Sequence, residues 1–264
     1  MRGSKIMAAV EVHTWEPNAN SGKPLLCLHE KGVPFVHHYI DMGAREHHEP
    51  AFLAINPGGT VPVLVHDGRV LTESTPMMEY IDDAFDGPAL RPADPALRWR
   101  MRWILRVMDN SVCPALAMVA SNTLAAPRFR ETPEEEKREA LAKIPDPERR
   151  RTWDLLMHDA TPPAEIAESQ RRVADGLALL DRMLGEYPYL AGPEFSLADI
   201  GVMATFYHLP VSRPEEVTSD KTPHLWNWLR RCHARPGLQE GFAMGRGFIS
   251  ARARQARDTL GMIR

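Results

Sequence analysis

The chain has 264 residues, of which 44% are hydrophobic and 25% are charged, and its formal net charge is −3. This length suffices for one large or two modest domains with real cores. The near-neutral charge argues against binding to nucleic acid or to a membrane surface. No uninterrupted apolar run approaches the ~18 residues of a membrane span. The three cysteines (Cys27, Cys113 and Cys232) form no short pairing motif, which favours a reducing compartment, the cytoplasm.

The first part of the chain predicts a strand, a helix and a second strand. Residues 7–14 alternate apolar and polar side chains, as does Val33–Ile40, and this alternation is typical of strands. Pro24–Glu30 reads as a helix, with Asn20 or Ser21 as its N-cap. A polar, histidine-rich connection follows over 43–55 and ends in a short helix.

A hairpin and a helix come next. Two apolar runs, Val61–Val65 and Arg69–Thr72, flank His66-Asp67-Gly68, and Asp-Gly between such runs is a strong hairpin signal. Thr75–Ala84 carries apolar residues on one helical face. The order βαβ then ββα predicts a thioredoxin-like α/β domain over 7–88, with its ligand cleft at the first βα turn.

The rest of the chain predicts an all-α domain over 95–250. Its apolar residues recur at helical spacing, and Pro114 is expected to kink the first long helix. Residues 126–163 are rich in proline and charge and predict a surface excursion with one short helix. Ser196 and Asp199 form an N-terminal capping pattern, so we expect Asp199 to be largely buried.

Val61-Pro62 and Glu73-Ser74 carry the main binding signals. An X-Pro bond is where a cis peptide costs little, and a cis bond here would turn the Val61 backbone toward a cleft where it could pair with an extended peptide. Ser74 would stand at a helix N-terminus, which suits a carboxylate. Together they predict a small acidic peptide as ligand.

These features together resemble the cytosolic glutathione transferase superfamily over nearly the whole chain. The similarity narrows to the bacterial glutathione-dependent β-etherases, which cleave β-aryl ethers of lignin fragments. The stretches that carry the narrower resemblance are Asn18–Pro24, Ile55–Pro62, His66–Thr75, Leu90–Pro95 and Ile144–Trp153. The resemblance implies glutathione as co-substrate, a thioredoxin-like domain followed by a helical domain, and a homodimer.

The glutathione thiol must be ionised, because the thiolate is the nucleophile. Ser21, first, and Asn20, second, are the candidate hydrogen-bond donors to it, at a helix N-terminus whose dipole also favours negative charge. The alternative is that either residue only caps the helix. The turn holds no tyrosine, which departs from several animal classes of the superfamily. It holds no cysteine either, which argues against chemistry through a protein thiol.

The resemblance also assigns the rest of the tripeptide. Val61, before Pro62, would pair with the cysteinyl backbone, while Glu73 and Ser74 would hold the γ-glutamyl group. For the glycyl carboxylate we expect His48 first, with Arg45 and His47 as alternatives. The competing interpretation of Glu73-Ser74 is a plain helix start, and that of the histidines is a solvated cluster with no ligand. No metal is predicted, since His37, His38, His47 and His48 show no recognised ligand spacing.

A second, apolar substrate would lie between the domains. Candidate wall residues are Trp15, Met108, Val112 and Met118, with Trp153 as a cover, although methionines at helical spacing are often core residues. The predicted reaction is displacement of an aryloxy group from an aromatic ether by the glutathione thiolate. A general conjugating transferase and a non-catalytic ligand-binding module are the alternatives.

Overall fold

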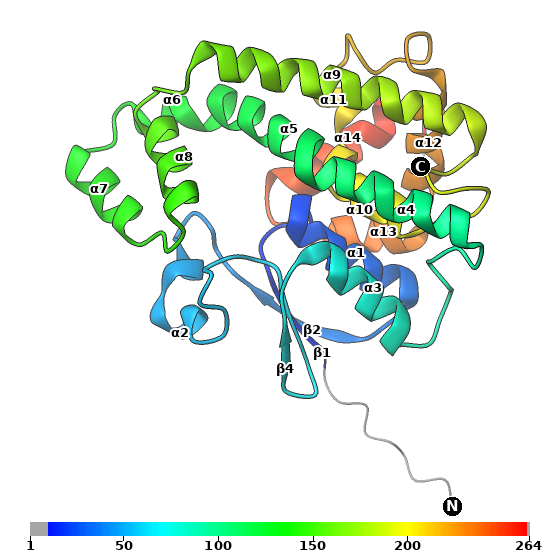
Figure 1. Cartoon of the computed structure of the whole chain (residues 1–264), viewed down its shortest axis with the longest axis horizontal. Coiled ribbons are helices and arrows are strands. Elements are labelled where there is room, and N and C mark those ends of the chain that lie inside the picture. The colour runs from blue at the N-terminus through cyan, green and yellow to red at the C-terminus, as the bar shows by residue number, and fades with distance from the viewer. Residues whose placement is uncertain (1–9, 263–264) are drawn as a thin grey trace, which may run out of the picture.

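The computed structural model describes residues 10–262. A four-stranded sheet forms the base of the molecule, and a larger set of helices lies over it, with α1 and α3 between the two layers (Figure 1). The predicted combination of a thioredoxin-like half and an all-helical half is confirmed. Residues 7–9 of the first predicted strand lie outside the described residues.

The sheet has the strand order β2-β1-β3-β4. Strand β1 pairs in parallel with β2 and antiparallel with β3, which pairs antiparallel with β4. The predicted Asp67-Gly68 hairpin is present, and both residues have positive φ, as a tight two-residue hairpin turn requires. The strands are β1 (Val10–Thr14), β2 (Phe35–Tyr39), β3 (Val63–His66) and β4 (Arg69–Leu71).

The first helix corrects the sequence interpretation. It begins at Ala19 rather than near Pro24, and Asn18 is its N-cap, so neither Asn20 nor Ser21 caps it. Pro24 lies inside this helix, beyond the first N–H groups that lack a helical partner, so it leaves the Asn20 carbonyl without its usual helical hydrogen bond. The helices of this half are α1 (Ala19–Lys31), the 3₁₀ turn η1 (Glu46–His48), α2 (Pro50–Leu53) and α3 (Ser74–Ala84).

The helical half contributes most of the chain and packs on α1 and α3. Helix α10 contacts α1, α3 and α4, which joins the two halves through one continuous core. The elements are α4 (Pro95–Val107), η2 (Met108–Val112), α5 (Cys113–Ala120), η3 (Ser121–Ala125), α6 (Ala126–Phe129), α7 (Glu134–Ala142), α8 (Pro147–Met157), α9 (Pro163–Glu186), α10 (Leu197–Phe206), α11 (Leu209–Ser212), α12 (Pro223–His233), α13 (Pro236–Ala243) and α14 (Phe248–Thr259).

Helices α4 to α6 form one long rod interrupted by two π-helical turns, η2 and η3. The first π turn ends at Val112, two residues before Pro114, where the sequence predicts a kink because proline cannot donate a helical hydrogen bond. Among the described residues, Pro95–Phe129 is the helix long and apolar enough to cross a membrane by length and composition alone. It packs against α9 and α10 in this fold.

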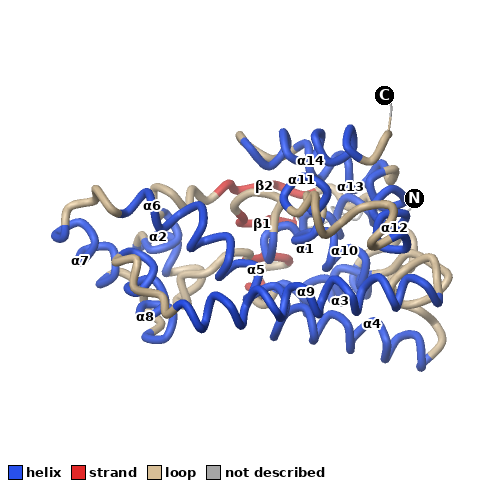
Figure 2. Tube along the Cα trace, turned by 90° about the horizontal axis from the view of Figure 1, so that it is seen from above, coloured by secondary structure: helices blue, strands red, loops and turns tan. Residues whose placement is uncertain are grey.

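The excursion differs from its prediction. It holds three helices, the four-residue α6 and the longer α7 and α8, rather than one, and its apolar residues Ala140, Ile144, Leu156 and Met157 are buried. Both views show α6, α7 and α8 gathered at one end of the molecule, away from α12 (Figure 2). The charged sequence therefore covers a small core of its own, which composition alone does not reveal.

The predicted capping pattern at α10 is confirmed. Asp199 is fully buried, and its Oδ2 accepts hydrogen bonds from the N–H and O–H of Ser196 at 2.9 and 3.0 Å. Its Oδ1 accepts from the Leu190 N–H at 3.0 Å and the Trp228 Nε1–H at 2.7 Å. One carboxylate thus joins the start of α10 to the preceding loop and to α12.

Candidate active site

A cavity of about 990 Å³ opens where the two halves meet. The first βα turn supplies Trp15 and Asn20, and the start of α3 supplies Glu73 and Ser74. The wall opposite comes from the middle of the rod (η2, α5 and η3) and from α10, α11 and α14. The predicted cleft at the first βα turn is therefore present, and it is continuous with a space inside the helical half.

Asn20 and Ser21 occupy different positions at the N-terminus of α1. Asn20 is exposed and lines the cavity, whereas Ser21 is only 4% exposed and does not line it. The Ser21 Oγ accepts a hydrogen bond from the Trp15 N–H at 3.3 Å, which leaves its hydroxyl proton available to donate. Both residues lie within the first turn of α1, where the helix dipole favours a negative charge.

Glu73 and Ser74 line the same cavity from the start of α3. Glu73 has a φ of 68°, a left-handed conformation that is uncommon for a residue with a side chain. Ser74 is the first residue of α3, so its hydroxyl stands beside the unpaired N–H groups of that helix. The pair provides a carboxylate next to hydrogen-bond donors, which matches an ammonium beside a carboxylate in a ligand.

The Val61-Pro62 peptide bond is cis, as the sequence analysis anticipates. The ladder between β1 and β3 starts at Val63, so Val61 lies outside the sheet pairing. Pro62 is buried and Val61 is half-buried.

His48 lies in η1, on the loop that precedes α2, and both of its ring nitrogens are buried without a hydrogen-bond partner. Burial, and then the charges of Arg149, Arg45 and Lys143, hold its pKa below the usual value. The three nearby cations, Arg149, Arg45 and Lys143, make this a favourable place for a carboxylate. Nδ1 of the neighbouring His47 also has no partner.

Sequence analysis missed the part that the excursion plays here. Arg149, in α8, donates from Nη1 to the Gly58 carbonyl at 3.3 Å, and Lys143 pairs with Glu49 at 3.6 Å. Figure 1 shows α8 descending from the end of the rod toward α2. The contact joins segments about ninety residues apart, and the local sequence carries no sign of it.

The predicted apolar wall is only partly where the sequence analysis places it. Trp15 lines the cavity, but Met108 and Val112 are buried in the core and lie outside its lining. Met118 is also outside the lining; its Sδ contacts Asn122. Trp153 packs edge-on against Phe129 within the excursion. The apolar wall is made instead by Leu116, Ala117, Val119, Ala120 and Leu124.

A buried charge network beside the cavity was also missed. Lys23, in α1, is buried and donates to Asp109 and, at 3.0 Å, to Thr75. Thr75 donates in turn to Asp109 Oδ2 at 2.6 Å. Asp109 is the only acidic residue between Asp94 and Glu131, and that isolation was the available signal. The network ties α1, α3 and the first π turn together at the cavity edge.

Comparison with known families and proteins identifies the framework of this site. The family model for the glutathione S-transferase N-terminal domain matches residues 19–84, and the model for the C-terminal domain matches residues 146–236. The chain belongs to the glutathione S-transferase family. The glutathione transferase fold explains why the first βα turn and the start of α3 face one cavity. It also makes the chain a glutathione-dependent transferase.

Individual relatives agree with this assignment. The chain is 36% identical over 241 residues to Protein LigF of Sphingobium sp. (strain NBRC 103272 / SYK-6), covering 88% of this chain and 93% of that protein. The crystal structure of beta-etherase LigF from strain SYK-6 matches with a TM-score of 0.85 and 34% identity, covering 90% of this chain and all of that one. Glutathione S-transferase PARB of Nicotiana tabacum is 25% identical over 88% of this chain and 97% of its own.

A more distant structure shares the fold. The theta class glutathione S-transferase of Xanthomonas axonopodis pv. citri, crystallised with glutathione bound, has a TM-score of 0.64 and 24% identity, covering 89% of this chain and 97% of that one. Similarity at this level supports the architecture.

Proposed function

We propose that the chain is a glutathione-dependent β-etherase. The glutathione thiolate attacks the carbon that carries an aryloxy group and lies next to a ketone. A carbon–sulfur bond forms as the carbon–oxygen bond breaks, so the products are a glutathione thioether and a phenolate, which takes a proton from solvent. The adjacent carbonyl activates the carbon, and the protein contributes positioning and stabilisation of the thiolate.

We assign the glutathione positions as the sequence analysis does. Asn20 and Ser21 donate to the thiolate, Val61 pairs with the cysteinyl backbone, and Glu73 and Ser74 hold the γ-glutamyl group. His48 holds the glycyl carboxylate, supported by its two unpartnered ring nitrogens. The main observation in favour of Asn20 is that it lines the same cavity as Ser74.

The observation that carries the β-etherase assignment is the similarity to LigF over nine-tenths of the chain, combined with the form of the cavity. A cavity of about 990 Å³ accommodates glutathione and a two-ring substrate. Polar donors lie at its N-terminal end, and the apolar residues Leu116, Val119 and Leu124 lie along the rod. An aromatic ether would place its rings on that wall.

A direct assay tests the assignment. The protein is incubated with glutathione and a β-aryloxy ketone that releases a fluorescent phenol, and an aryl halide serves as a parallel substrate. We expect stoichiometric phenol and thioether. Rapid conjugation of the aryl halide without phenol release would replace the β-etherase assignment by a general transferase, and failure to bind a glutathione column would leave a non-catalytic module.

We also propose that the protein is a cytoplasmic homodimer. Two stacked indoles on α4, Trp99 and Trp103, have ring centroids 6.1 Å apart, and Trp99 is 65% exposed. An exposed tryptophan pair beside the Arg102–Glu79 ion pair is typical of a protein interface. Sedimentation of the wild type and of a Trp99→Glu variant tests this, with the variant expected to be monomeric.

A further inference from the structure

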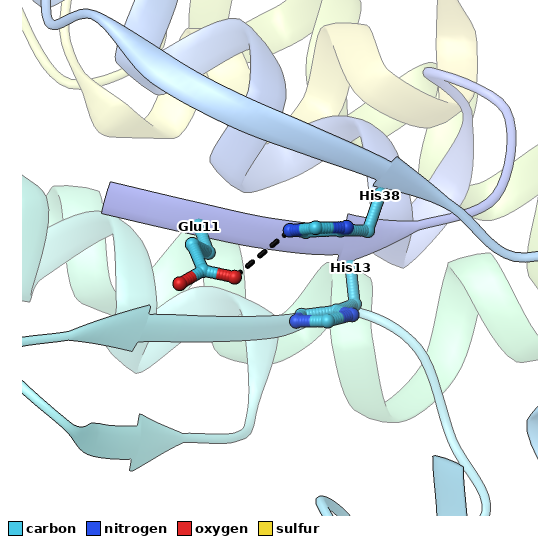
Figure 3. Close-up of side chains that lie close together, drawn as sticks. All are labelled: Glu11, His13 and His38. Atoms are coloured by element: carbon cyan, nitrogen blue, oxygen red, sulfur yellow. Dashed lines mark hydrogen bonds and ion pairs between the residues drawn. The ribbon is translucent and has the colours of Figure 1, made fainter. Parts of the chain in front are cut away.

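A second group of chemically active side chains lies on the opposite face of the sheet from α1. Glu11 and His13 are two residues apart on β1, so they share one face. His38, on β2, is the register partner of His13. Val12, between them, is fully buried on the other face. Figure 3 shows the three side chains gathered on the same side of the two strands.

Their ligand atoms converge. One nitrogen from each histidine and one oxygen of Glu11 all lie within 4.8 Å of one another. His38 Nε2 is 2.8 Å from Glu11 Oε2, and the two imidazole rings are stacked with centroids 4.5 Å apart and an interplanar angle of 14°. Both rings turn a nitrogen toward the carboxylate (Figure 3).

We propose that Glu11, His13 and His38 form a binding site for one divalent transition-metal ion, with water completing the coordination. Two imidazoles and a carboxylate suit borderline ions such as Zn²⁺, Ni²⁺ and Cu²⁺. Mg²⁺ and Ca²⁺ prefer oxygen ligands and are disfavoured. None of the three residues lines the catalytic cavity, so the site is separate from the glutathione chemistry.

The surroundings support ligation. His13 is only 8% exposed, and its imidazole is held in place between the ring of His38 and the packed face of the sheet. Its other neighbours are apolar: Phe52 of α2 meets the ring edge-on at 6.4 Å, and Val63 is its register partner on β3. The alternative explanation is a simple ion pair between Glu11 and His38. That explanation does not account for the imidazole of His13, which is stacked on His38.

Binding requires a small rearrangement that the exposed members can make. Ligand atoms around a tetrahedral zinc ion are about 3.3 Å apart, given bonds of about 2.0 Å, so the three groups must move closer together. The side chains of His38 and Glu11 are 41% and 42% exposed, which leaves room to tilt and an open path for the ion. His13 is the buried, fixed member.

Calorimetric titration of the untagged, chelator-treated protein with zinc chloride tests the site. We expect one equivalent to bind, and we expect Glu11→Gln and His38→Ala each to weaken binding at least tenfold. The matched control is His224→Ala, an exposed histidine on α12, which should bind zinc as the wild type does. Cobalt(II) should give a visible absorption band in the wild type that both ligand variants lose.

The site is independent of the proposed function, so glutathione affinity is measured beside zinc affinity and should not change in Glu11→Gln or His38→Ala. The two ligand variants alter half-exposed side chains, and circular dichroism verifies their folding. If the wild type bound no zinc at a free zinc concentration of about 100 µM, its dissociation constant would be too high for a specific site. That result would overturn the proposal. Equal zinc affinity in the wild type and both ligand variants would also overturn it.

Discussion

The proposed donors to the glutathione thiolate, Ser21 and Asn20, give the sharpest functional prediction. Ser21→Ala and Asn20→Ala each remove one side chain from the first turn of α1 while the helix dipole remains. A hydrogen bond to a charged group contributes about 1.5–3 kcal/mol, and one pKa unit corresponds to 1.36 kcal/mol. The variant that loses the main donor should therefore raise the pKa of bound glutathione by about one to two units.

The rate follows from that shift. If the thiol pKa rises from about 7 by one to two units, the thiolate fraction at pH 7 falls by roughly fivefold to fiftyfold, and by about fifteenfold at the middle of that range. We expect Ser21→Ala to lower turnover at least tenfold and to spare most of the glutathione affinity, because the backbone and carboxylate contacts remain. The Ser21 Oγ also accepts a hydrogen bond from the Trp15 N–H at 3.3 Å, so the Ser21→Ala variant loses this local contact as well. Ser219→Ala, at an exposed serine, controls only for the preparation and handling of a serine-to-alanine variant.

The assay is the pH dependence of kcat with a fast electrophile, combined with ultraviolet titration of the bound thiolate. The acid limb of the profile should move to higher pH in the variant that lost its donor. A larger shift in Asn20→Ala than in Ser21→Ala would assign the main role to Asn20, which lines the cavity. Unchanged profiles in both variants would refute the reasoning that this turn stabilises the thiolate.

Three further outcomes are expected. Asp199→Ala leaves buried donors without an acceptor and should lower the free energy of unfolding by about 3–5 kcal/mol in urea titrations; a loss below about 1 kcal/mol would contradict the network. His48→Ala should weaken glutathione binding about tenfold or more but leave γ-glutamylcysteine, which lacks the glycyl carboxylate, unaffected in calorimetry. Burial lowers the pKa of His233 to about 4, so the unfolded state binds more protons between that value and about 6.5. Its stabilising contribution is therefore complete above pH 6.5 and is lost as the pH falls, by about 2 kcal/mol between pH 7 and 5. His233→Gln should flatten that part of the pH–stability curve, and an unchanged curve would argue against a neutral buried imidazole.

The sequence predicted those elements well whose conformation depends on interactions between neighbouring residues. The Asp67-Gly68 turn needs two left-handed residues, and the Ser196–Asp199 cap needs only neighbouring groups, so both could be predicted from a few letters. The first residue of α1 could not be predicted in this way. Asn20, Ser21 and Asn18 are all good capping residues, and packing of α1 against α10 and α3 decided among them.

The site divides in the same way. Glu73 and Ser74 stand at a helix start that the sequence marks, and the thioredoxin-like order brings that start to the same cavity as Asn20 in the first turn of α1. Arg149 and Asp109 reach the site across long stretches of chain, so only the tertiary contacts show them. Met108 and Val112 have the apolar spacing of a wall, but spacing does not say which side of a helix meets the cavity and which meets the core.

The amino-acid sequence determined the element order, the caps and turns, and the chemical character of the glutathione-binding half, because each depends on neighbouring residues. Tertiary structure decided which side chains share a surface. Strand register places His13 beside His38, and the folded excursion brings Arg149 within reach of the loop that carries His48. Such meetings depend on the summed packing of the whole chain, and no short stretch of sequence contains that information.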